Sequence, residues 1–143
     1  METEEPLTKS EQKLLKKSTG QLIQLAQKET NRYVRLRDQD KPCISCMKNS
    51  IDDAGHYIAV GRCEKLRFDL DNIHGQCRIC NYHGGGETVD YRINLIKRIG
   101  KERVERLEEK YRILKRDTSK WDKVELILWI RQIRKKIKEF YGR

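Results

Sequence analysis

The amino-acid sequence predicts a mainly helical α+β fold in which a small cysteine-rich module lies between two helical flanks. Apolar residues recur at helical spacing before residue 40 and after residue 87, and two Cys-x-x-Cys pairs lie between these stretches. Only 36% of the 143 residues are hydrophobic, against roughly 45–50% in ordinary soluble domains. A further 38% are charged. We therefore expect a small centre that does not depend on one large apolar core.

Residues 1–40 are predicted to form an acidic tail and then an amphipathic helix that reaches about Arg37. Thr8-x-x-Glu11 has the form of a capping box, in which side chains satisfy two backbone donors at a helix start. Apolar residues from Leu14 onward recur every three or four positions. Gly20 costs about 1 kcal/mol in a helix interior, so the helix could break near it.

Residues 41–86 are predicted to form the module. Pro42 ends the helical region, and a Gly- and Asn-rich stretch follows. The apolar run Tyr57–Val60 predicts a hairpin that turns near Gly61. A loop and a short helix starting around Cys77 complete a ββα order.

Residues 87–143 are predicted to form three helices. The first ends at Gly100, where a C′ glycine belongs. The second covers Lys101–Leu114, and Thr118 or Ser119 can cap the last, which has an apolar stripe and a basic end.

The five cysteines indicate a metal site. Two pairs, separated by 77 − 46 − 1 = 30 residues, each place two thiolates on one tight turn: Cys43, Cys46, Cys77 and Cys80. In the cytosol such pairs bind metal more often than they form disulfides. The alternative is four buried cysteines without metal. We predict one structural zinc ion, with a closed four-sulfur sphere that stabilises the ββα module, and we expect Cys63 to pack as a small apolar residue.

The net charge of +10 favours nucleic acid as a partner over a generic soluble surface. The longest apolar run, Leu126–Ile130, is far too short to span a bilayer. The acidic N-terminus has no apolar segment of the secretory type. These features predict no membrane association and a cytoplasmic location.

Three residues in and after the gap between the cysteine pairs suggest chemistry. His56 on the hairpin, Asn72 in the loop and Asn81 after the second pair resemble, in their order, the HNH nuclease motif, a ββα-metal fold. The resemblance implies that His56 is the general base, that Asn72 orients it, and that Asn81 binds a divalent cation. A neutral imidazole, with an ordinary pKa near 6.5, can take a proton from water.

The pattern departs from the motif at one position. Many HNH sites have a metal-binding aspartate before the histidine, and this chain has Gly55. The remaining ligand, of which His83 is one candidate, would come from Asp52, Asp53, Asp69, Asp71, His74 or His83. The alternative for His56 is a structural histidine in a zinc module that only binds DNA.

A longer resemblance covers about residues 24–115. The chain is similar to the lambda-phage NinG (Rap) recombination family in Pro42–Cys46, Ala54–Tyr57, Leu66–Asp69, Asp71–Cys77, Cys80–Asn81 and Tyr91–Leu95. This implies a structure-specific endonuclease that cuts branched DNA, notably Holliday junctions, with Mg or Mn, in the cytoplasm of a bacterial host. The chain departs from the family in having no cysteine in residues 1–20 and more glycine in Tyr82–Gly86.

Basic residues provide candidate phosphate contacts, which position DNA without reading its sequence. Four flank the proposed site and three lie on the last helix: Arg62, Lys65, Arg67, Arg78, Arg131, Arg134 and Lys135. The alternative is a solvated helix face. The amphipathic outer helices favour a homodimer, unless they pair within one chain. Competing functions are a non-catalytic zinc DNA-binding recombination accessory protein or regulator, and an HNH nuclease of the nicking or restriction type.

Overall fold

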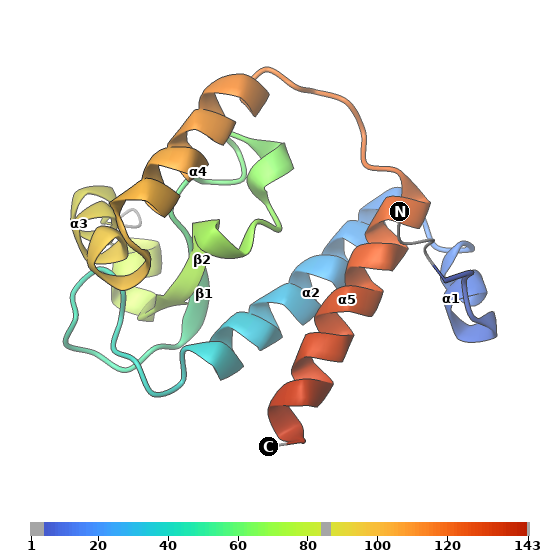
Figure 1. The fold of residues 1–143 in the computed structure, drawn as a ribbon, viewed down its shortest axis with the longest axis horizontal. Coiled ribbons are helices and arrows are strands. Elements are labelled where there is room, and N and C mark those ends of the chain that lie inside the picture. The colour runs from blue at the N-terminus through green and yellow to red at the C-terminus, as the bar shows by residue number, and fades with distance from the viewer. Residues whose placement is uncertain (1–4, 84–86, 143) are drawn as a thin grey trace.

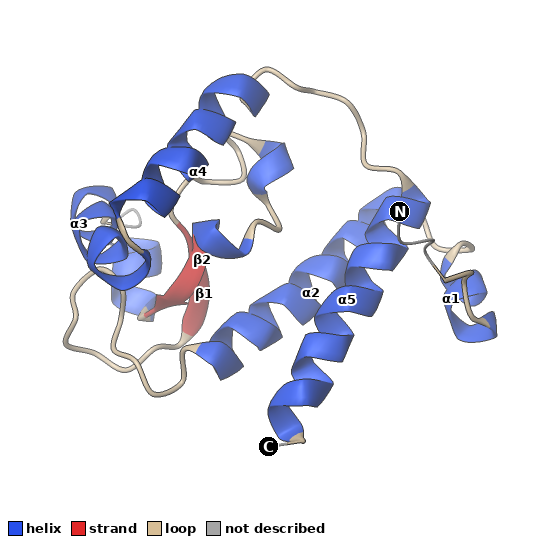
Figure 2. Ribbon diagram, viewed as in Figure 1, coloured by secondary structure: helices blue, strands red, loops and turns tan. Residues whose placement is uncertain are grey.

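The computed structural model describes residues 5–83 and 87–142, except for the side chain of His83. Its helices and strands confirm a mainly helical α+β fold with one small sheet (Figure 2). In chain order they are α1 Lys9–Leu14, α2 Thr19–Arg37, β1 Asp53–His56, β2 Ile73–Gln76, α3 Thr88–Ile99, α4 Lys101–Leu114 and α5 Lys123–Tyr141. The sheet lies between the α3–α4 pair on one side and α2 on the other (Figure 1).

The predicted N-terminal helix is divided into α1 and α2 close to Gly20, where the sequence indicated a weak point. Thr8 and Glu11 form the predicted capping box at the start of α1. A second capping box, made by Ser18 and Gln21, starts α2. Two caps so close together favour two helices because each satisfies backbone donors that would otherwise be lost at the break.

The predicted hairpin at Gly61 is wrong. β1 pairs antiparallel with β2, so that His56 lies opposite Ile73, and residues 57–72 form a long connection between the strands. This connection contains 3-10 turns at Glu64–Leu66 and Leu70–Asn72. Tyr57–Val60 does not form a strand. The N–H of Ile58 donates to the side chain of Asn72, and the side chain of Ile58 packs in the core. The predicted short helix after Cys77 is a π-helical turn at Ile79–His83.

The C-terminal helices follow the predicted boundaries more closely. Gly100 ends α3 with φ 92°, a conformation that favours glycine. The prediction of Thr118 or Ser119 as the last cap is wrong. Asp122 caps α5 by accepting from the N–H groups of Val124 and Glu125.

Two apolar cores hold the elements together. One packs the strand connection against α3 and α4, and it includes Cys63, which is buried as predicted. The other packs α2 against α5, with Phe68 of the connection between them. The amphipathic faces that suggested a homodimer therefore cover each other within one chain, and dimerisation stays a prediction. In the described ranges, none of the helices has the length and apolarity needed to cross a membrane.

Candidate active site and metal centre

The two cysteine pairs come together at one end of the sheet. The sulfur atoms of Cys43, Cys46, Cys77 and Cys80 all lie within 4.8 Å of one another. The Cys46 and Cys77 sulfurs are 4.0 Å apart, close to the roughly 3.8 Å edge of a tetrahedron with zinc–sulfur bonds of about 2.3 Å. Four cysteines are thus positioned to bind a metal ion. The geometry is consistent with a structural zinc that has no open coordination position.

Backbone and side-chain N–H groups surround these sulfurs as they would surround thiolates. The N–H of Cys80 and the side-chain amide of Asn49 both donate to the Cys77 sulfur at 3.5 Å. Burial raises the pKa of the Cys77 thiol, but these donors outweigh it and lower that pKa to about 7. The deprotonated form that binds zinc is therefore accessible at Cys77 near neutral pH, whereas burial raises the pKa values of Cys43 and Cys80.

His56 ends β1 and points its ring at the strand connection. Its Nε2 atom lies 2.9 Å from the main-chain oxygen of Arg67. Because a carbonyl only accepts, Nε2 must donate, and in a neutral ring the lone pair is then on Nδ1. Burial lowers the pKa of His56 below its ordinary value of 6.5, and the nearby positive charge of Arg67 lowers it further. The ring is therefore neutral at pH 7 and can act as a base.

Asn72 holds both ends of the segment that positions His56. It is fully buried. Its Oδ1 accepts from the N–H of Ile58 at 2.8 Å. Its Nδ2 donates to the carbonyls of Ile58 and Leu66 at 3.0 and 3.2 Å. Ile58 follows His56 by two residues, and Leu66 directly precedes the residue whose carbonyl holds the imidazole. This arrangement supports the predicted orienting role.

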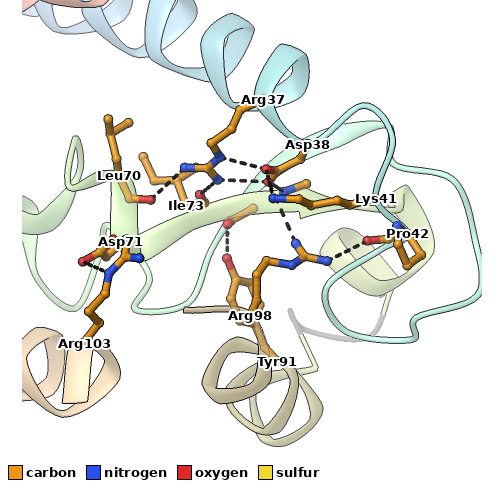
Figure 3. A network of polar contacts seen from close by, with 12 residues as sticks. Arg37, Asp38, Lys41, Pro42, Leu70, Asp71, Ile73, Tyr91, Arg98 and Arg103 are labelled. Carbon is orange, nitrogen blue, oxygen red and sulfur yellow. Dashed lines mark hydrogen bonds and ion pairs between the residues drawn. The ribbon is translucent and has the colours of Figure 1, made fainter. Parts of the chain in front are cut away.

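The end of α2 clamps the same turn from one side. Arg37 donates to the carbonyls of Leu70 and Ile73, at 3.2 and 2.7 Å. Its guanidinium also makes two bonds to Asp38, at 2.8 and 2.9 Å. Asp38 is fully buried and accepts from the N–H of Gly75 in β2. Figure 3 shows how this network joins α2 to the turn that contains Asn72.

Helix α4 clamps the turn from the other side. Arg103 pairs with Asp71, and Lys110 pairs with Asp69 at 3.0 Å. Asp69 also caps its own turn by accepting from the N–H of Asp71. Both aspartates therefore have structural partners, which accounts for them without a role as metal ligands.

Gly55 is fixed by its surroundings. Tyr91 of α3, which is labelled in Figure 3, donates to its carbonyl at 2.7 Å. A Cβ atom at position 55 would lie 1.9 Å from the side-chain oxygen of Gln76, whose amide also donates to Ser45 at 2.8 Å. An aspartate at position 55 would have to displace Gln76, which gives the departure from the HNH pattern a physical cause.

Asn81 lies beside Asp53 at the opposite end of β1 from His56. Its Nδ2 is 3.4 Å from Asp53 Oδ2, and Asp53 also pairs with Arg78 at 3.3 Å. The structure shows no direct contact between His56 and Asn81. The two ends of β1 are about 10 Å apart at a strand rise of about 3.3 Å per residue.

The other two histidines differ from His56. His74 of β2 is 2% exposed, and its Nδ1 atom has no hydrogen-bond partner among the described residues. Burial, with a smaller contribution from Arg37, lowers the pKa of His74 to about 3. It is thus a neutral, buried residue of the sheet. The predicted cation ligand His83 has its side chain outside the described residues.

The seven residues predicted to contact phosphate differ in how strongly bonds within the chain already hold them. Arg131 donates to Glu11 and to the carbonyls of Glu5 and Pro6, so a DNA contact would have to replace those bonds. Arg67 and Arg78 pair with Glu64 and Asp53. Arg134 makes only a 3.9 Å contact with Glu29, and Lys135 lines a hollow beside it. Lys65 and Arg62 lie over the rings of Trp121 and Tyr111.

Several residues that support the site from a distance have little recognisable signal in the sequence. These residues bond to the turn or to the sheet, yet each looked like an ordinary helix residue: Arg37, Asp38, Tyr91, Arg103 and Lys110. Of these only Asp38 carried a local signal, since an acidic residue at a helix C-terminus opposes the helix dipole and requires another partner.

Comparison with known proteins decides the family. Residues 1–141 match the family described as Bacteriophage Lambda NinG protein. The chain belongs to the NinG family. It is 45% identical over 101 residues to Protein ninG of Escherichia phage 933W, which is 69% of this chain and 50% of that protein. The corresponding identity is 44% over 101 residues, with the same shares, for Escherichia phage lambda.

Protein ninG of Salmonella phage P22 is 43% identical over 102 residues, which is 70% of this chain and 50% of that protein. This NinG-family chain therefore spans about half the length of the curated relatives it matches. No solved structure matches it. The resemblance seen in the sequence is confirmed at the level of the family.

Proposed function

We propose that this NinG-family chain is a metal-dependent endonuclease that cuts branched DNA, such as Holliday junctions, during phage recombination. The observation that carries the proposal is the contact between His56 Nε2 and the Arg67 carbonyl. It presents a neutral ring nitrogen from the end of β1, in a segment that Asn72 fixes at both ends. The order of strand, pinned connection, strand and helical turn is the order that an HNH nuclease requires.

His56 would act as general base. Its Nδ1 lone pair would take a proton from the water that attacks the phosphorus, and Asn72 would keep the ring in place. General bases contribute typically 10²–10⁴-fold to a rate. The lowered pKa of His56 keeps the ring in its neutral, proton-accepting form at neutral pH.

Asp53 and Asn81 would hold the divalent cation. Their side-chain atoms already lie 3.4 Å apart. Asp53 is on the same side of β1 as Gly55, because side chains alternate along a strand, and it would have to exchange its ion pair with Arg78 for the cation. When bound, Mg or Mn would offset charge that develops on the phosphate and the leaving oxygen. Mg²⁺ commonly binds through one or two carboxylates together with water and substrate phosphates.

The zinc module and the basic surface would hold the substrate. No described element resembles a helix dedicated to reading bases, and phosphate contacts suit recognition of DNA shape. Symmetric cuts in two strands require two active sites, so the proposal includes two copies of the chain on one junction.

The test is cleavage of a synthetic four-way junction, a flap and a linear duplex by zinc-loaded protein, with and without Mg or Mn. Wild type should cut the junction only with Mg or Mn. His56→Ala should lose at least about 10²-fold in rate with unchanged junction affinity and zinc content, and added imidazole should restore part of the rate. Asp53→Asn should require more Mg or Mn for half-maximal rate. Cutting by His56→Ala at the wild-type rate would refute the assignment.

A second candidate function is a non-catalytic zinc DNA-binding accessory protein or regulator. The ion pair between Arg78 and Asp53 favours it, because that pair would have to break before Asp53 could bind a cation. This function predicts tight junction binding with no cutting under any divalent cation, and no effect of His56→Ala on binding.

A further inference from the structure

Most basic side chains around the module are neutralised by a carboxylate. The pairs are Arg67 with Glu64, Arg78 with Asp53, Arg92 with Glu108, Arg103 with Asp71 and Lys110 with Asp69. Arg62 and Lys115 differ from these. Within the described ranges, neither has a carboxylate at ion-pair distance. Arg62 comes from the strand connection and Lys115 from the end of α4.

Arg62 and Lys115 converge on one ring. The Arg62 guanidinium carbon lies 5.4 Å from the centroid of the Tyr111 ring, and Lys115 Nζ lies 5.7 Å from it. Arg62 also donates to the Tyr111 hydroxyl at 3.3 Å. All three line an open hollow of about 400 Å³, and Tyr57 and Thr88 contribute to its wall.

The acid in this hollow does not balance the two cations. Glu108 accepts two bonds from Arg92, at 2.9 and 3.0 Å, and one from the Tyr57 hydroxyl. Arg112, which also lines the hollow, pairs with Glu109. A cation over an exposed aromatic ring gains only about 0.5–1 kcal/mol, and two cations on one ring repel each other. An anion between them would satisfy both.

We propose that this hollow binds a backbone phosphate of the DNA, as a site separate from the catalytic cation. Arg62 presents forked N–H donors, which suit phosphate oxygens, and Lys115 adds a point charge. The Tyr111 oxygen already accepts from Arg62, so its own hydrogen is available to the same phosphate. Tyr57, in the wall of the hollow, directly follows His56 in the chain.

The site rests on the proposed function in that it takes DNA as the substrate. It adds a specific claim, that Arg62 and Lys115 share a single phosphate. For duplex arms the logarithmic salt slope of binding changes by about 0.9 per phosphate contact. Two cations on one phosphate should therefore change the slope once, and the effects of their substitutions should not add.

The experiment measures binding of a fluorescent four-way junction between about 50 and 200 mM salt, without added Mg or Mn. Arg62→Gln, Lys115→Gln and the double variant should each lose about fivefold to tenfold in affinity, equivalent to roughly 1–1.4 kcal/mol. The slope should fall in magnitude by about 0.9 in all three. Tyr111→Phe keeps the ring and should lose less affinity.

The matched control removes one lysine charge and one arginine charge elsewhere, from the exposed surface of α4. Lys101→Gln with Arg106→Gln leaves the hollow intact, and these side chains lie beside acids of the same helix, Glu105 and its neighbours. The control should change affinity by less than about twofold because these cations are exposed and already screened. The four substituted cations are exposed and Tyr111 is partly buried, so thermal unfolding checks that each variant is folded.

Three results separate the two proposals. A double variant that binds like the control overturns the phosphate site, while junction cutting by wild type leaves the endonuclease proposal standing. If the variants show the expected fall in salt slope but the wild type never cuts a junction, the phosphate site is supported and the endonuclease proposal is refuted. Additive losses with a slope change near twice 0.9, or about 1.8, would mean two phosphates and refute the shared site.

Discussion

Substitution of Asn72 by alanine tests whether one buried amide positions the candidate base. The change removes three hydrogen bonds, to the N–H and carbonyl of Ile58 and to the carbonyl of Leu66. The N–H and carbonyl of Ile58 then stay buried without this partner, at about 1 kcal/mol or more each, whereas the carbonyl of Leu66 keeps its bond from the N–H of Asp69. The sum predicts a loss of about 2–3 kcal/mol in the free energy of unfolding, or a fall in Tm of about 4–12 °C.

Urea unfolding followed by tryptophan fluorescence measures this loss. Trp121 is a suitable reporter because its ring centroid lies 5.2 Å from that of Phe68, in the same connection. Asn31→Ala is the matched control. Asn31 is a partly buried asparagine on α2 that accepts one bond from Gln27, so its loss should cost about 0.5–1.5 kcal/mol or less.

The effect on function should exceed the effect on folding. At temperatures where Asn72→Ala is fully folded, its junction cutting should still fall at least about tenfold, because the ring of His56 is no longer held between Ile58 and Arg67. Zinc content and half-maximal Mg concentration should not change. A variant that unfolds like Asn31→Ala, or cuts like wild type when folded, would contradict the positioning role.

Three further predictions concern pH and metal. Because the pKa of His56 is lowered and its neutral form is the base, the cutting rate should fall on the acid side only below about pH 6.5, and a pH–rate profile checks this. His74 has a folded pKa of about 3, so the stability it contributes is present above pH 6.5 and is lost as the pH falls. Unfolding at pH 5 should be easier by about 2 kcal/mol than at pH 7, and His74→Gln should flatten that difference. Cys80→Ser should lose the bound zinc and the hydrogen-exchange protection of β1 and β2, because metal binding in such sites is coupled to folding.

The features that the sequence predicted are those that local physics determines. The spacing of four cysteines specifies two turns, and Thr8 with Glu11 specifies a helix start within four residues. Periodicity located α2, α3 and α4 because each buries one stripe. Gly100 marked a helix end because its φ of 92° is a conformation that favours glycine.

The features that the sequence missed depend on residues far apart in the chain. The partner of β1 begins at Ile73, and nothing local to Tyr57–Val60 says that this apolar run turns into the core instead of forming a strand. The bonds from Arg37 to the carbonyls of Leu70 and Ile73 cross more than thirty positions. Hydrogen bonds of this kind have no periodicity, so a single sequence cannot reveal them.

Gly55 shows why a departure from a motif must be weighed against the structure. Taken alone, the missing acid argues against catalysis. In the fold, the carbonyl of Gly55 is held by Tyr91 and the space beside its Cα is filled by Gln76. The position cannot carry an acid without displacing a buried side chain, whatever the function. Asp53, two residues earlier on the same side of β1, already lies against Asn81. The absence of an acid at position 55 is therefore explained by packing and does not count against a cation site at Asp53.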